Sequence, residues 1–135
     1  MRKLMLAGAA LLASGCNTPG LNEEPGRLIG VWGGPHAGIV FQGGLGDVEF
    51  DCASGTIDGT VTPGKDGSFM GQGTYRTGTS GPVRVGQFFK SQRATYMGTV
   101  VDKTNMTLNV ELEDGTHIGP FSLVQNAPPQ TTRCL

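Results

Sequence analysis

The side chains best suited to chemistry in this 135-residue chain include two histidines and a run of carboxylates. His36 and His117 are the only histidines, and neither stands in a His-x-x-x-His spacing. A zinc site would need the fold to bring them together with Asp47 or Asp51. We therefore predict no metal and no cofactor. Both histidines are interpreted as loop residues, and His36, which follows Pro35, is a candidate contact on the rim of the fold.

The carboxylates of Asp47, Glu49 and Asp51 alternate along DVEFDC, so they face one side of a strand. They could bind calcium or form an acid–base pair, but such a row is more often solvated or neutralised by cations on neighbouring strands. No Gly-x-Ser-x-Gly occurs, and GTVTPGKD has Asp66 where a phosphate-binding loop needs Ser or Thr. We predict that the chain is not an enzyme.

The first residues, MRKLMLAGAALLASGC, have the order of a secretory signal. Arg2 and Lys3 precede an uncharged apolar stretch from Leu4 to Leu12, which is about half as long as a bilayer-spanning helix. Small residues then lead to Cys16. The sequence predicts a signal peptide over residues 1–15.

The same segment resembles a bacterial lipoprotein signal, in which the cysteine after the small residues receives lipid and becomes the mature N-terminus. The usual leucine three positions before that cysteine is replaced by Ala13 here. The resemblance implies lipidation at Cys16, membrane attachment through the lipid, and a place in the cell envelope as an outer-membrane lipoprotein facing the periplasm. The alternative is cleavage near Gly15 and a secreted or soluble periplasmic protein.

The cysteine count supports this interpretation. If Cys16 carries lipid, Cys52 and Cys134 are left to pair in an oxidising compartment. The alternative is two buried free thiols. We predict the Cys52–Cys134 disulfide, which would tie the C-terminal segment to the rest of the domain.

The mature chain is mildly acidic, because loss of residues 1–15 leaves eight Lys and Arg against eleven Asp and Glu. Without a basic stripe, nucleic acid is not an expected partner. Residues 16–26 hold the lipidated cysteine and a Pro- and Gly-rich stretch that is typical of a flexible tether. Residues 27–135 have the length of one small domain.

The elements expected in that domain are short strands. In NMTLNVEL, Met106, Leu108, Val110 and Leu112 alternate with polar residues, as in a half-buried strand. Turn signals such as Gly43-Gly44 and Asp114-Gly115 separate several runs of this kind. Glycines inside the strand patterns permit sharp coiling. We predict an all-β fold, a small antiparallel barrel of about seven or eight strands, with a two-sheet β-sandwich as the alternative.

Residues 28–36, LIGVWGGPH, hold the only tryptophan. Gly30-Val31-Trp32 resembles the Gly-x-Trp signature of the calycin group, which includes lipocalins and avidin-like barrels. The resemblance implies that Trp32 closes one end of a barrel under a late basic residue, here Arg133. A ligand contact by Trp32 is the alternative. The blocks WGGPH, EFDCASGTIDG, GPVRVG and RCL resemble a family of short uncharacterised bacterial secreted proteins.

These observations predict a non-enzymatic binding protein of the cell envelope. Its expected partner is a small apolar ligand or an envelope protein, held at a rim formed by Trp32, His36, Phe88 and Phe89. The alternative function is inhibition of a periplasmic protease or of lysozyme.

Overall fold

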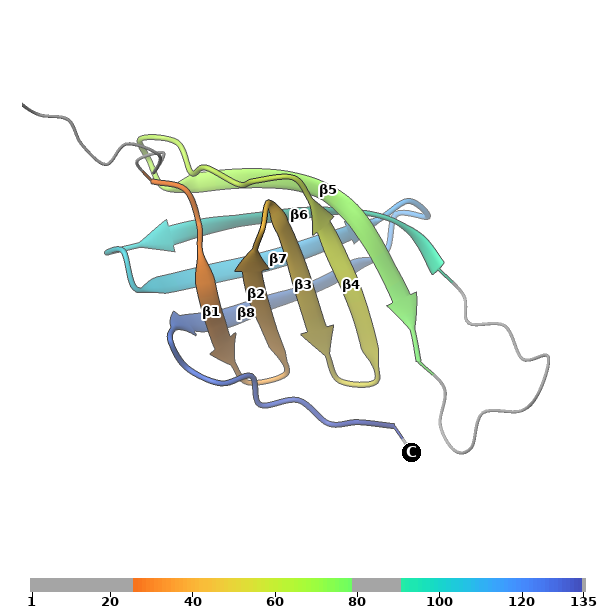
Figure 1. Ribbon diagram of the computed structural model, residues 1–135. Coiled ribbons are helices and arrows are strands. Elements are labelled where there is room, and N and C mark those ends of the chain that lie inside the picture. Colours follow the sequence, from red (N-terminus) through yellow and green to blue (C-terminus); the bar gives the residue numbers. More distant parts are fainter. Residues whose placement is uncertain (1–25, 79–90, 135) are drawn as a thin grey trace, which may run out of the picture.

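The computed structural model describes residues 26–78 and 91–134, which form a closed antiparallel β-barrel (Figure 1). Each strand pairs with the next along the chain, and the first pairs with the last. The strands are β1 (Gly30–Gly34), β2 (Ala37–Gln42), β3 (Leu45–Phe50), β4 (Ala53–Asp58), β5 (Ser68–Thr77), β6 (Ser91–Val101), β7 (Asn105–Leu112) and β8 (His117–Gln125). The predicted small barrel is confirmed, and the sandwich alternative is not seen.

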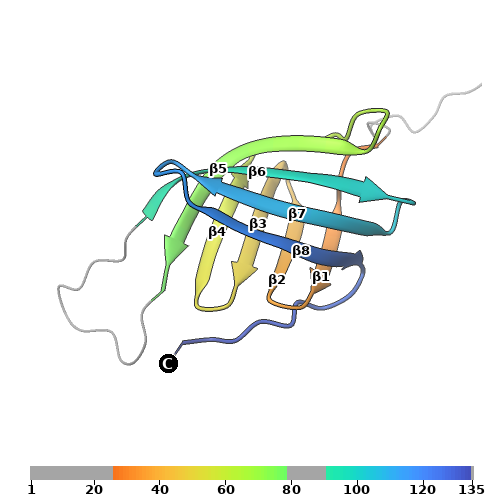
Figure 2. The same cartoon turned by 180° about the vertical axis from the view of Figure 1, so that it is seen from behind.

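The barrel has two halves of different strand length. β1 to β4 contain five or six residues each, whereas β5 to β8 contain eight to eleven. In Figure 1 the short strands lie in front, and β7 and β8 cross behind them. In Figure 2, seen from the other side, β7 and β8 lie in front. Part of the long strand β5 pairs with β4 and nearly all of it pairs with β6, so it joins the two halves.

Side chains fill the interior, as expected for eight strands. The predicted alternation in β7 is confirmed, because Met106, Leu108, Val110 and Leu112 are all buried. Every fully buried side chain among the described residues is hydrophobic. The largest of them are Trp32, Tyr96, Ile39, Ile57, Met106, Leu108, Leu123 and Val110.

The C-terminal strap, which we define as residues 126–134, runs along the outside of the first two strands (Figure 1). Side chains at Gly33 and Gly38 would collide with Ala127, Pro128 or Pro129, so these two glycines allow the strap to lie flat. The amide of His36 donates to the carbonyl of Gln130 over 2.9 Å. Cys52 and Cys134 lie at disulfide distance, with 4.9 Å between their Cα atoms, as predicted.

The two ends of the barrel are built differently. At one end, which we call the closed end, β1 begins, β6 ends in a turn to β7, and the segment between β4 and β5 folds over the opening (Figure 1). The amide of Leu28 donates to the carbonyl of Val61 over 2.8 Å, and both side chains are buried. Within the described part of the chain, no helix is long and apolar enough to cross a membrane.

Candidate functional site

The opposite end, which we call the open end, contains a solvent-accessible hollow of about 540 Å³. The β1–β2 turn and the β3–β4 turn form one side, and the first half of β8 forms the other. Its lining combines aromatic, proline and small polar residues: Pro35, His36, Phe50, Asp51, Tyr75, Ile118, Gly119, Pro120, Phe121 and Ser122.

The hollow exists because β1 and β8 pair over only two positions, Trp32 with Gln125 and Gly33 with Val124. β1 stops at Gly34 and turns into β2 before the first half of β8 can pair with it. A bulge between β7 and β8 near Leu108 further disturbs the ladder there. Bulges at barrel rims commonly redirect side chains in this way. The first half of β8 therefore extends beyond the end of β1 and has no partner on that side.

Aromatic rings form the floor of the hollow. The ring centre of Phe50 lies 5.2 Å from that of Tyr75, 5.5 Å from that of Phe121 and 6.5 Å from that of Tyr96. Tyr96 is fully buried, while Tyr75 and Phe121 are partly exposed. Partial burial also raises the pKa of the Tyr75 hydroxyl. The floor thus offers flat apolar surface to a molecule outside.

The two tyrosines differ in their hydroxyl groups. The Tyr96 hydroxyl donates to the carbonyl of Thr74 over 2.6 Å, and burial raises its pKa well above the usual value. The Tyr75 hydroxyl has no hydrogen-bond partner among the residues that the structure describes. It therefore gives the hollow an unused donor and acceptor beside apolar rings.

His36 and Asp51 stand together on the rim. His36 Nδ1 lies 2.5 Å from Asp51 Oδ2, and the amide of Thr132 donates to Asp51 Oδ1 over 2.7 Å. The hydrogen bond from Thr132, followed by that from His36, lowers the pKa of the Asp51 carboxyl. The φ angle of His36 is 70°, a left-handed conformation that the turn after Pro35 requires. The pair joins the two turns to the strap and frames the hollow.

Ser122 also lines the hollow, so the three residue types of a hydrolytic triad meet there. A nucleophilic serine needs a hydrogen bond to the histidine that activates it. No such bond joins Ser122 and His36 in the described residues. Because Asp51 also binds the Thr132 amide, the His36–Asp51 pair is explained by its structural role.

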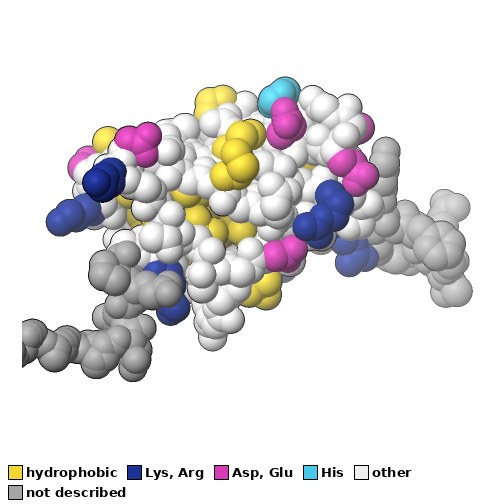
Figure 3. Space-filling model, turned by 90° about the horizontal axis from the view of Figure 1, so that it is seen from above, with side chains coloured by type: hydrophobic (Ala, Val, Ile, Leu, Met, Phe, Trp, Pro, Cys, Tyr) yellow, Lys and Arg dark blue, Asp and Glu magenta, His cyan; other side chains and the backbone are white. Residues whose placement is uncertain are grey.

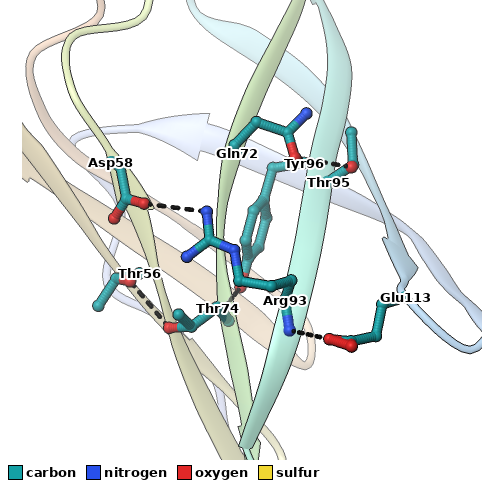
Figure 4. Close-up of polar contacts among 8 residues, drawn as sticks. All are labelled: Thr56, Asp58, Gln72, Thr74, Arg93, Thr95, Tyr96 and Glu113. Carbon is teal, nitrogen blue, oxygen red and sulfur yellow. Dashed lines mark hydrogen bonds and ion pairs between the residues drawn. The ribbon is translucent and has the colours of Figure 1, made fainter.

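The outer wall formed by β4, β5 and β6 carries polar side chains. Arg93 Nη2 lies 3.2 Å from Asp58 Oδ2, and the Arg93 amide donates to Glu113 over 2.9 Å (Figure 4). The hydroxyls of Thr56 and Thr74 are 2.8 Å apart across β4 and β5. Thr56 and Thr74 pair across neighbouring strands, whereas Arg93 on β6 reaches over β5 to Asp58 on β4. We assign this wall a structural role.

The structure places the predicted site residues in different surroundings. His36 lies on the rim of the hollow, as expected. Trp32 is 2% exposed, and its indole N–H donates to the carbonyl of Ile29 over 3.2 Å, so it belongs to the core. Arg133 is exposed next to Cys134 at the open end, and its packing over Trp32 stays a prediction. Cys16, Phe88 and Phe89 lie outside the described residues.

Sequence reasoning missed Phe50, Tyr75 and Phe121 as site residues. The alternation pattern places Phe50 and Tyr75 on inward faces, but it cannot show that β1 ends while β8 continues past it. The hollow is seen only when the first and last strands are placed side by side.

No family model, curated protein or solved structure matches this chain. The resemblances to lipoprotein signals, to calycins and to short secreted proteins therefore stay predictions. Among the described residues, no three His, Cys, Asp or Glu side chains are grouped as a metal ion would require.

Proposed function

We propose that this chain is an exported, lipid-anchored barrel that binds another envelope protein without catalysis, and that the open end is its binding surface. The observation that carries the proposal is the aromatic hollow between β8 and the two turns. The signal-like first residues and the Cys52–Cys134 pair support export.

A partner at the surface is favoured over a small molecule inside the barrel. Trp32, Tyr96 and Leu108 occupy the interior and are fully buried, so a lipocalin-like ligand would have to displace core side chains. The hollow has the volume of a ligand pocket, but it is wide open. Small-molecule sites bury most of the ligand surface. An inserted side chain from a protein needs no such enclosure.

The chemistry of the hollow indicates the kind of side chain that it accepts. Phe50, Tyr75 and Phe121 would pack against an aliphatic or aromatic group, and the free Tyr75 hydroxyl could bond to a backbone amide or carbonyl. Central apolar anchors in pockets commonly dominate protein interfaces. The His36–Asp51 pair and the strap hold the rim in place, which lowers the ordering cost of binding.

Site-specific photo-cross-linking tests the proposal in the producing cell. A photoreactive phenylalanine replaces Tyr75 in the hollow, and a matched variant carries it in place of Met70, which is 65% exposed on the wall of β5. We expect a protein adduct of one defined mass from position 75 only, and its loss when Phe121→Ala is added. Adducts of equal yield from position 70, or none from position 75, would refute the proposed surface.

A further inference from the structure

The closed end carries most of the exposed large hydrophobic side chains in the described residues. Four of the five lie at strand ends there, namely Ile29, Leu45, Val101 and Val124, and we call them the apolar rim. Their exposed fractions are 50%, 40%, 53% and 43%. Because β1 and β3 begin at this end while β6 and β8 finish at it, the topology itself gathers these residues.

Cations accompany the apolar rim. Arg27 precedes β1, Lys65 lies between β4 and β5, and Lys103 lies between β6 and β7. No ion pair involves these three side chains within the described residues. Arg27, Ile29 and Leu45 line one small depression of about 20 Å³. In Figure 3, Lys and Arg side chains lie beside hydrophobic ones and beside Asp or Glu at the left of the view, on the side where β6 ends.

The carboxylates next to the two lysines in the sequence stay charged but are held by hydrogen bonds within their own turns, which lower their pKa values. Asp66 accepts hydrogen bonds from the amide and hydroxyl of Ser68, over 3.0 and 2.7 Å. Asp102 accepts from Thr104 and Asn105 within its own turn. Neither lysine forms an ion pair with them in the described residues, so both ammonium groups can contact an anion outside the protein.

The short segment after Cys16 keeps the predicted lipid near the closed end. Nine residues lie between Cys16 and Gly26, where the described structure begins at the closed end. Even a fully extended chain of that length spans at most about 36 Å, so the closed end cannot move far from a lipid on Cys16. Exposed apolar side chains with lysines beside them, held this close to a bilayer, match the residues that bind membrane interfaces.

We propose that the closed end docks on the membrane surface, with the apolar rim at the headgroup boundary and Lys65 and Lys103 against anionic headgroups. This inference rests on the lipid anchor of the proposed function. Docking in this way would direct the hollow at the open end away from the bilayer, where a partner can reach it.

Accessibility of single labels tests the docking. The mature lipidated protein, with its disulfide intact, carries an environment-sensitive fluorophore on Leu45→Cys, Val101→Cys or Met70→Cys. It is bound to vesicles of phosphatidylglycerol and phosphatidylethanolamine. We expect aqueous iodide to quench positions 45 and 101 several-fold less than position 70, and spin-labelled lipid to quench only the first two. Equal quenching at all three positions would overturn the inference.

Two controls separate the docking from the anchor. The double variant Lys65→Glu with Lys103→Glu should restore iodide quenching at position 101, while the protein still floats with the vesicles. Flotation with equal quenching would refute the docking alone and leave the lipid anchor intact. Failure to float would refute the anchor, and the docking with it, but would not affect photo-cross-linking at the open end.

Discussion

One end of this barrel is covered by its own side chains, whereas the other end is open to solvent. At the closed end, Leu28 and Val61 cover the core, and the depression lined by Arg27, Ile29 and Leu45 measures about 20 Å³. At the open end, β1 ends beside the middle of β8, and a hollow of about 540 Å³ exposes part of an aromatic cluster. The residues expected to contribute most to the free energy of unfolding lie in the covered core. The surface available to a partner lies where the pairing of β1 with β8 stops.

Truncation of buried aromatic residues should give the largest difference between the two regions. Trp32→Ala and Phe41→Ala remove side chains that are 2% and 7% exposed. Each should lower the free energy of unfolding by about 3–5 kcal/mol. Phe121→Ala at the hollow should cost about 1–2 kcal/mol, because its ring is already partly exposed. Urea denaturation measures all three, and equal losses would contradict the contrast.

Removal of the disulfide should have the next largest effect. The double variant Cys52→Ser with Cys134→Ser opens a loop closed over a separation of 82 residues. We expect a loss of about 2–4 kcal/mol, with roughly 4.5 kcal/mol as the limit of the chain-entropy estimate. Amide exchange should accelerate at Gln130 and Thr132 more than in β7. A count of two free thiols in the denatured, unreduced mature protein would refute the bond itself.

Removal of single tyrosine hydroxyls should give a smaller difference in stability between the core and the hollow. Tyr96→Phe leaves the Thr74 carbonyl without its buried donor and should cost about 1–3 kcal/mol. Tyr75→Phe should change stability by less than about 0.5 kcal/mol, because it breaks no hydrogen bond that the structure describes. The same variant should weaken the photo-cross-linked complex. A large stability loss from Tyr75→Phe would show that its hydroxyl is structural.

Acid should loosen the open end before the barrel unfolds. The lowered pKa of Asp51 means that its stabilising contribution is complete above the usual carboxyl pKa, near pH 4. That contribution is lost as the pH falls through the lowered value. NMR of the Thr132 amide should therefore show a titration below pH 4 that Asp51→Asn removes. An unchanged titration in the variant would mean that Asp51 does not hold the strap.

The barrel could be predicted from the sequence because its strands alternate clearly. Met106, Leu108, Val110 and Leu112 all point inward as expected, and the glycine pair at Gly43-Gly44 takes up the positive φ angles that a tight hairpin uses. The pairing of Cys52 with Cys134 follows from the odd cysteine count together with the predicted lipid on Cys16. These features depend on local pattern or on counting.

The site could be predicted only in part. His36 was found because a histidine after Pro35 in a glycine-rich bend must lie near the surface. Its partner Asp51 was placed on a strand face instead, and Trp32 was considered as a rim residue although the core encloses it. Tyr75 and Phe121 come from strands far apart in the chain. The exposed edges of these two rings share one hollow because β1 ends before the first half of β8.

A single cross-linking experiment on the membrane-bound, lipidated protein compares the two ends directly. A photoreactive phenylalanine replaces Phe121 at the open end in one variant and Leu45 at the closed end in another. The proposals predict a protein adduct from position 121 and a lipid adduct from position 45. Protein adducts from position 45 with lipid adducts from position 121, or the same adducts from both, would contradict them.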